Sequence, residues 1–359
     1  MQTLLDPAIL FFIFGVFAGL VKSNLEIPAP ISRFLALYLL MSLGLKGGFA
    51  LAHSGLTPEV ATSLGCALLL AVVVPTIGYL LLRRFLAPFD AAAVAATYGS
   101  VSAVTFITAV QYMETQGYGF GGHMAAAMAL MESPAIILAV VVANALRQQA
   151  NASPVVLQRD ASLALQSTGG LGLAGGNGQG KGRNSLGKVL HESLTDGAQL
   201  LLLGAMVVGL LSGDDGKAAM KPFSGDLFKG MLAFFLLDMG LMAARSMGQL
   251  KGQSPWAFVY AVVGPMVHAA LALALGMAAG MSAGDTGLLM VLAASASYIA
   301  VPAVLRYAMP EANASLYFGM SLGVTLPLNI LLGIPVYVAL ARHFIPACVT
   351  WLHWLRWPC

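Results

Sequence analysis

Long apolar stretches that carry almost no charge run through most of the chain, and they limit what it can fold into. Ten of them approach the roughly 20 residues that an α-helix needs to cross a bilayer. Only 9% of the residues are charged, against about 25% in a typical soluble domain, so too few charges remain to cover a water-facing surface. The stretches also lack the alternation of an outer-membrane β-barrel. The sequence therefore predicts an all-α polytopic membrane protein.

The charged residues between these stretches set the approximate limits of ten transmembrane helices. The first and the sixth are the shortest, because 15 residues separate Asp6 from Lys22 and 17 separate Asp196 from Asp214. Long charged side chains near helix ends can extend to the membrane surface, which still allows both helices to span. The expected helices cover residues 7–22, 31–52, 60–82, 91–113, 121–146, 189–211, 225–244, 256–281, 286–306 and 313–341.

The remaining composition excludes several other classes of protein. The net charge of +3 is too small to indicate a nucleic-acid partner. The cysteines, Cys66, Cys348 and Cys359, have neither metal-ligand spacing nor the pattern of a disulfide framework. No Lys or Arg precedes the first apolar stretch, so we expect it to be the first transmembrane helix rather than a cleaved signal peptide.

Lys and Arg residues are distributed unequally between the two sides of the expected membrane protein. Twelve of them follow the odd-numbered helices, and five lie on the opposite side. Cytoplasmic loops carry the excess of positive charge in membrane proteins. The sequence therefore predicts a multi-pass protein with both termini outside the cytoplasm.

A polar segment at 148–187, rich in Gly, Ser, Gln and Asn, divides the chain into two halves and is predicted to be a cytoplasmic linker. Within it, residues 175–182 have the glycine and lysine spacing of a phosphate-binding loop. However, Gly182 replaces the magnesium-binding Ser or Thr, and no strand precedes it. The predicted organisation is a first five-helix repeat at 1–147, the linker at 148–187, a second repeat at 188–342 and an extracytoplasmic tail at 343–359.

The two halves align as copies of one unit, because four pairs of helices match in order at shifts of 190 to 196 residues. Each unit holds an odd number of helices, so the second copy must be inserted upside down. Inverted repeats with a binding site between them are typical of secondary transporters. The matched pairs are Asp90 with Asp285, Ser100 with Ser295, Ser102 with Ser297, Tyr112 with Tyr307, Ser42 with Asp238, Pro75 with Pro265, and Pro134 with Pro327.

The paired serines are the most specific local signal. The segments 99–105 (GSVSAVT) and 294–302 (ASASYIAVP) combine small residues and hydroxyls near the middle of their helices. Gly99 and Pro302 favour interruption of each helix there, and a helix that restarts directs its free N–H groups at an anion. The alternative is that Ser and Ala only allow close helix packing. The occurrence at matched positions of both repeats favours a binding site.

Two acidic residues, Glu132 and Asp238, lie well inside expected helices. A charge there is costly, so a functional role is the default interpretation. A coupling cation is the natural partner, because carboxylate, hydroxyl and carbonyl oxygens are its preferred ligands. Thr325 and Asn329 flank Pro327 and could add such oxygens. The alternatives are a protonated structural acid or a hydrogen bond between helices.

Three other features are expected to be structural. Lys46 is expected to extend its ammonium group to the outer surface. His268 is expected to pack in the core, because no acid is paired with it in the sequence. Gly15 and Gly19 form a GxxxG pair that predicts close contact with a second helix.

The chain resembles the cyanobacterial sodium-dependent bicarbonate transporter family, SbtA. The similarity covers nearly the whole chain, and it is most specific at 37–51 (LYLLMSLGLKGGFAL), 98–106 (YGSVSAVTF), 131–136 (MESPAI) and 236–244 (LLDMGLMAA). It implies sodium-driven bicarbonate uptake for a CO2-concentrating mechanism, in the inner (plasma) membrane of a photosynthetic bacterium. It also implies a fold with crossing broken helices, a homotrimer, and control from the cytoplasm by a PII-like protein (SbtB type).

The expected mechanism is symport by alternating access, with Na+ as the coupling ion and no organic cofactor. Bicarbonate would lie between the two Ser-x-Ser breaks, with sodium beside it to offset its charge. The residues expected to bind bicarbonate are Gly99, Ser100, Ser102, Ala103, Ser295 and Ser297, and those expected to bind sodium are Asp238, Thr105, Glu132, Thr325 and Asn329.

Other functions remain open from the residues alone. One is sodium-coupled uptake of an organic anion, although the expected site has no buried arginine to clamp a carboxylate. A channel is another. An intramembrane hydrolase is the third, with Ser100 or Ser102 as nucleophile and His123 or His268 as base. Neither serine lies in a G-x-S-x-G elbow, so we expect no enzymatic activity.

Overall fold

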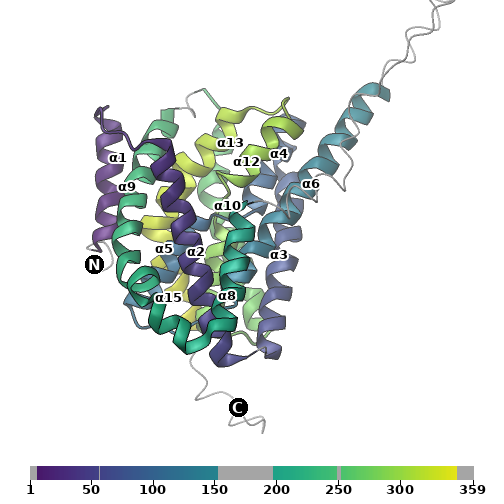
Figure 1. The fold of residues 1–359 in the computed structure, drawn as a ribbon. Coiled ribbons are helices and arrows are strands. Elements are labelled where there is room, and N and C mark those ends of the chain that lie inside the picture. The colour runs from purple at the N-terminus through teal and green to yellow at the C-terminus, as the bar shows by residue number, and fades with distance from the viewer. Residues whose placement is uncertain (1–5, 56, 153–196, 249–251, 346–359) are drawn as a thin grey trace, which may run out of the picture.

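A computed structural model describes residues 6–55, 57–152, 197–248 and 252–345 (Figure 1). Every regular element in these residues is a helix, which confirms the all-α class. The elements are α1 (Pro7–Leu20), α2 (Ala29–Ser54), α3 (Pro58–Leu82), α4 (Pro88–Gly99), α5 (Ala103–Thr115), α6 (Met124–Ala152), α8 (Gly197–Met220), η2 (Lys221–Asp226), α9 (Leu227–Met247), α10 (Pro255–Ala278), α11 (Ala283–Ala294), α12 (Ala300–Ala308), α13 (Ala314–Met320), η4 (Ser321–Thr325), α14 (Leu326–Leu328), η5 (Asn329–Gly333) and α15 (Ile334–Phe344).

Proline sets the start of many of these helices. It occupies the first turn of α1, α2, α3, α4 and α10. An N–H group in that turn has no acceptor within the helix, so its loss costs nothing there. α2 ends at Gly55, whose φ of 73° suits a residue without a Cβ.

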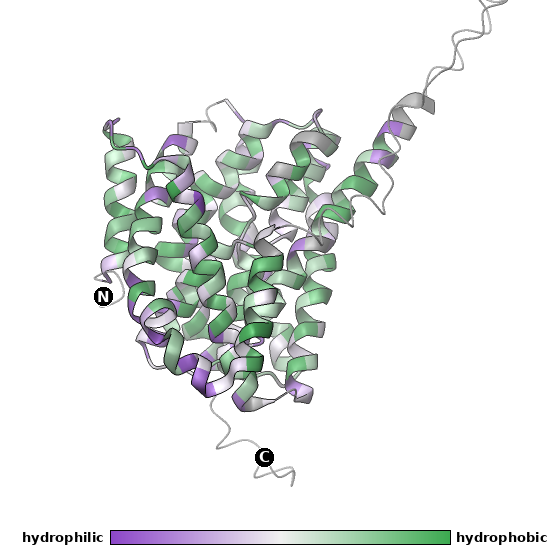
Figure 2. Cartoon of the chain, in the orientation of Figure 1, coloured by the Kyte–Doolittle hydropathy of each residue, from purple (hydrophilic) through white to green (hydrophobic). Residues whose placement is uncertain are grey.

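Seven helical stretches of the described residues are long and apolar enough to cross a membrane, and Figure 2 shows apolar residues over most of the helical surface. One of them, Leu200–Met247, is 48 residues long and includes α8, η2 and α9. Its helix is interrupted at Gly213, where φ is 55°. Two further apolar helices, Pro7–Leu20 and Ala283–Ala294, are shorter. The multi-pass class is confirmed, whereas the number of ten spans stays a prediction.

Two helix pairs, α1 with α9 and α2 with α8, pack along much of their length with glycines at the contact. A Cβ on Gly15 would lie 2.3 Å from the carbonyl oxygen of Leu237 in α9. A Cβ on Gly48 would lie 2.1 Å from the carbonyl oxygen of Met206 in α8. The close contact expected at Gly15 is therefore confirmed, and small residues let these backbones approach each other.

The replacement Gly48→Ala should destabilise the protein by about 1–3 kcal/mol, because the new methyl group forces α2 and α8 apart. Gly204→Ala in α8 is the matched control, since a Cβ there meets nothing within 4 Å. Thermal unfolding of the purified proteins in detergent measures the stability of both variants. Equal melting temperatures for the two variants would contradict close packing at Gly48.

The interrupted helices occupy the centre of the molecule. In the most apolar 18-residue window of Pro88–Thr115, which contains α4 and α5, 94% of the residues are buried, whereas the corresponding share in α3 and in α10 is 39%. α3 packs on α4, and α10 packs on α11. Large apolar side chains of α3 and α10 are exposed on the outer surface, among them Leu68, Val72, Val263 and Val267. The outer helices thus surround two central, broken ones.

The last helical stretch, Ala314–Phe344, contains two π-helical segments. Thr325 ends the first, η4, and Asn329 begins the second, η5, with Pro327 between them. A proline has no N–H to donate, so the regular ladder of hydrogen bonds cannot continue through it. The flanking positions that the sequence singled out therefore lie at an irregular part of the helix.

The expected division of the chain is tested only in part. α6 continues to Ala152, beyond the boundary predicted at 147. Most of the linker at 148–187, including the glycine-rich segment 175–182, lies outside the described residues, as does most of the tail at 343–359. The repeats at 1–147 and 188–342 stay a prediction.

Candidate functional site

The first helix break separates α4 from α5. Gly99 ends α4 against the ring of Pro75, where a Cβ would lie 2.3 Å from a ring carbon. Ser100 and Ser102 then adopt extended conformations. Ser102 begins α5 as its N-cap, with its Oγ accepting a hydrogen bond from the N–H of Thr105 at 3.2 Å. Serine is among the best residues for this role.

The second break separates α11 from α12. Ser295 ends α11 in an extended conformation, and α12 begins at Ala300. The Oγ of Ser297 accepts a hydrogen bond from the N–H of Val301 at 3.3 Å. Both helices are therefore interrupted at the Ser-x-Ser pairs, as the sequence predicts.

The two breaks form hydrogen bonds with each other. The N–H of Ser102 donates to Oγ of Ser295 at 2.9 Å. The N–H of Ser297 donates to the carbonyl oxygen of Thr97 at 2.8 Å. All four residues are buried. The fold thus brings the serines of both halves into one polar junction inside an apolar core.

Some polar groups at this junction are still available to a ligand. The buried Oγ of Ser100 has no hydrogen-bond partner in the described part of the chain, a state that costs about 1–3 kcal/mol. The N–H groups of Ala103 and Val104 begin α5, where a helix offers them no acceptor. α12 offers fewer such donors, because Pro302 has no N–H. The first break is therefore the better donor of hydrogen bonds to an anion.

Thr325 and Asn329 both contact the helix ends at the breaks. The hydroxyl of Thr325 bonds with that of Tyr98, next to Gly99, at 2.6 Å. The Nδ2 of Asn329 donates to the carbonyl oxygen of Ala294, the last residue of α11, at 2.8 Å. Both side chains are buried. The Oδ1 of Asn329 accepts a hydrogen bond from the hydroxyl of Tyr337 at 3.3 Å, and the hydroxyl of Thr325 donates to the carbonyl oxygen of Ala261 at 2.8 Å.

Thr105 belongs to the same junction, while Glu132 occupies a different helix. The hydroxyl of Thr105 bonds with Oγ of Ser102 at 3.0 Å. Glu132 is half-buried on α6, near Pro134 inside that helix, and has an interaction of its own. The role of Glu132 as a sodium ligand stays a prediction.

Asp238 is buried on α9, where its carboxylate accepts a hydrogen bond from the hydroxyl of Ser32 in α2. The next residue, Met239, contacts the second break, because the hydroxyl of Tyr298 lies 3.6 Å from its Sδ. Tyr298 thus connects the residue next to Asp238 with the second break.

Sequence reasoning did not single out Tyr298 or Tyr98. Tyr298 lies inside the ASASYIAVP motif, two residues before α12, so its position was a usable signal. Tyr98 directly precedes the first motif and is matched to Ala293 at the shift of 195, so the repeat gave no indication of its role.

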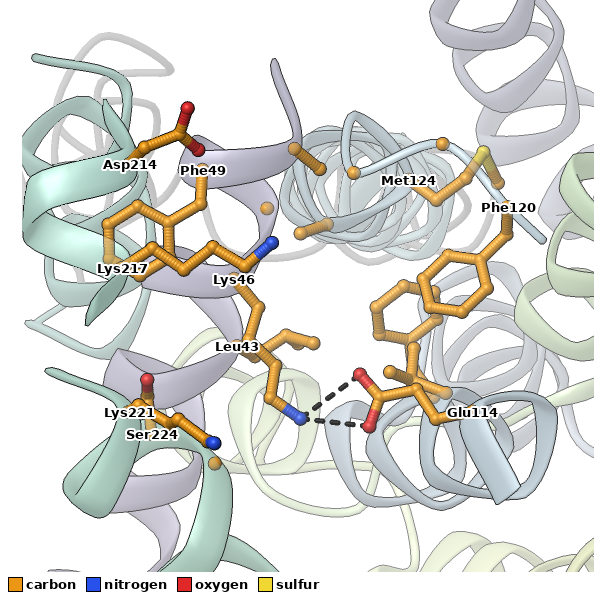
Figure 3. Close-up of a pocket in the computed structure, with 18 of the residues that line it drawn as sticks. Leu43, Lys46, Phe49, Glu114, Phe120, Met124, Asp214, Lys217, Lys221 and Ser224 are labelled. Carbon is orange, nitrogen blue, oxygen red and sulfur yellow. Dashed lines mark hydrogen bonds and ion pairs between the residues drawn. The ribbon is translucent and has the colours of Figure 1, made fainter. Parts of the chain in front are cut away.

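A cavity of about 600 Å³ lies between α2, α5, the start of α6 and the segment 214–225 (Figure 3). We call it the lysine pocket, because Lys46, Lys217 and Lys221 line it. Lys46 forms an ion pair with Glu114 at 2.9 Å and lies 4.1 Å from the centre of the Phe228 ring. The extension of its ammonium group to the outer surface stays a prediction.

The arrangement of the histidines does not favour hydrolysis. His268 lies 3.5 Å from the hydroxyl of Tyr260, and His123 lies 3.8 Å from the carboxylate of Asp285. The hydroxyl of Ser102 instead interacts with Thr105. No described hydrogen bond joins Ser100 or Ser102 to either histidine, so the described residues form no nucleophile–base pair.

Comparison with known families gives one match. The model of the Na+-dependent bicarbonate transporter superfamily matches residues 7–342, which includes both helix breaks and the lysine pocket. No curated protein matches the chain significantly.

Proposed function

Because the chain belongs to the Na+-dependent bicarbonate transporter superfamily, we propose that it takes up bicarbonate by symport with sodium. The observation that best supports this function is the junction of two broken helices, where the buried hydroxyl of Ser100 has no partner in the described residues. An oxyanion bound there would accept hydrogen bonds from this hydroxyl and from the start of α5. The anion site comprises Gly99, Ser100, Ser102, Ala103, Ser295 and Ser297.

Sodium binds beside the anion in this mechanism. Thr105 and Thr325 bring hydroxyl oxygens to the helix ends around the junction, and oxygen is the ligand that hard cations prefer. Asn329 contacts the end of α11 through its Nδ2, and its oxygen would have to leave Tyr337 to join the ion. The residue next to Asp238, Met239, contacts Tyr298 of the same region. Each charge offsets the cost of burying the other, so the two binding events are coupled.

Alternating access requires that the two halves of the chain can exchange conformations around this site, so that it opens to one side of the membrane at a time. The packing of α3 on α4 and of α10 on α11 supports equivalent roles for the two halves. The pairing of α1 with α9 and of α2 with α8 supports the same conclusion, because the first helix of each half packs on the second helix of the other half. This arrangement and the aligned motifs support two inverted repeats of five helices.

The topology makes a separate prediction. Epitope tags at either terminus should be accessible to antibody in intact cells, and a tag at 160–185 only after the membrane is permeabilised. The reason is that twelve Lys and Arg residues lie on the linker side and five on the other. Protection of one terminus in intact cells would rule out an inverted pair of five-helix units.

Family membership also motivates two proposals about assembly. We propose a homotrimer in the bacterial inner membrane, for which the exposed apolar side chains of α1, such as Phe14 and Phe17, offer contact surface. We further propose regulation by a PII-like protein at the cytoplasmic face. Cross-linking of the purified protein and co-purification with such a partner test each proposal independently.

Initial rates of labelled bicarbonate uptake into proteoliposomes test the proposed function. We expect saturable uptake that rises with external sodium and falls to the protein-free background in choline. Uptake that does not saturate would indicate a channel. Stronger competition by an organic anion than by unlabelled bicarbonate would indicate that the carrier transports organic anions.

A further inference from the structure

The lysine pocket is a basic cavity that the proposed symport mechanism does not use. Of its charged groups, Lys46 and Glu114 neutralise each other in an ion pair. Lys217 and Lys221 are exposed and form no ion pair in the part of the chain that the structure describes. Asp214 is the only other acid of the lining. The pocket therefore carries an excess of positive charge, with the ammonium groups around one space (Figure 3).

One wall of this pocket belongs to the helix that begins at the candidate anion site. Phe106, Val110 and Glu114 line the pocket from α5, and their spacing of four residues places them on one face of that helix. The N–H of Phe106 donates to the carbonyl oxygen of Ser102 at 3.0 Å. The inner end of the wall is thus about one turn, or roughly 6 Å, from the junction.

Apolar side chains close the inner end of the pocket. Phe106 and Val110 are each 1% exposed, and Met124 at the start of α6 is fully buried. The charged groups lie farther out, because Glu114 is two turns along α5 from Phe106 and remains partly exposed. A basic mouth above an apolar floor is the arrangement expected of a vestibule in front of a closed gate.

The predicted topology places this vestibule on the outer side of the membrane. Lys217 and Lys221 belong to the connection that the charge distribution places outside the cytoplasm. A substrate arriving from outside would therefore meet them before it reaches the serines.

We propose that the lysine pocket is the outer vestibule of the transport path, where Lys217 and Lys221 attract and transiently bind small anions such as bicarbonate. This inference rests on the proposed function. A concave site lined by one sign of charge concentrates the opposite ion and speeds its arrival. Lysine ammonium groups are mobile point charges, so they attract a small anion through their charge rather than through a fixed geometry.

The double variant Lys217→Gln/Lys221→Gln tests the proposal in intact cells that express the protein. At low ionic strength we expect its half-saturation concentration for bicarbonate to rise roughly fivefold or more, with little change in maximal rate, because each contact is worth about 1 kcal/mol in water. Added choline chloride at constant sodium should remove the difference, since salt screens exposed charges. Lys217→Arg/Lys221→Arg should behave like wild type.

Lys229→Gln is the matched control, because Lys229 is an exposed lysine in the first turn of α9, near the same connection, and does not line the pocket. An equal rise in this control would show a general surface effect and overturn the vestibule. An unchanged half-saturation concentration in the double variant would also overturn it, while leaving the symporter intact. A wild-type protein without sodium-dependent uptake would overturn the proposed function and the vestibule together.

Discussion

Ser297→Leu is expected to abolish bicarbonate uptake while folded protein persists in the membrane. The N–H of Ser297 joins the two breaks through Thr97, and its Oγ caps the start of α12. A leucine side chain would remove the cap and occupy the polar junction. Loss of the oxyanion's hydrogen bonds and of its space should lower affinity at least 100-fold, or about 2.7 kcal/mol. Ser102→Leu should have the same effect from the other side.

Binding of labelled bicarbonate to the purified variants measures this effect directly. Ser63→Leu is the matched control, because it also replaces a buried serine but lies on α3. Uptake per folded molecule should survive in that control. Wild-type affinity in both Ser297→Leu and Ser102→Leu would contradict an anion site between the breaks.

Asp238→Asn is expected to shift the sodium activation of uptake to higher concentration by about tenfold or more, equivalent to roughly 1.4 kcal/mol. The substitution keeps the size of the side chain and its contact with Ser32 but removes the negative charge. A buried carboxylate without an ion pair in the described residues needs a proton or a cation to balance it. We predict that sodium fulfils this role, directly or through a neighbouring ligand.

The shift is read from uptake rates over a range of sodium concentrations, normalised to folded protein. Asp226→Asn, an exposed acid just before α9, is the control and should leave the curve unchanged. An unchanged curve in Asp238→Asn as well would make Asp238 structural. The cation site would then lie around Thr105, Thr325 and Asn329.

The sequence was most informative where short-range chemistry decides the conformation. Glycine and serine at 99–102 predicted the end of one helix, and the matched motif predicted the end of another, because capping and small residues act within a few positions.

Contacts between distant segments could not be predicted in the same way. The partner of Lys46 is Glu114, 68 residues away, and nothing in the local pattern of either helix indicated the pair. The register in which Ser102 meets Ser295 depends on how the two broken helices pack, which periodicity does not specify. The contact of Tyr298 with Met239, 59 residues away, depends on the same packing.

Accumulation of labelled bicarbonate in proteoliposomes, driven only by an inward sodium gradient, tests the coupling of the two ions most directly. We predict that internal bicarbonate rises transiently above its equilibrium level and that a sodium ionophore abolishes the rise. Uptake that only reaches equilibrium, with the same time course in sodium and in choline, would contradict sodium–bicarbonate symport by this protein.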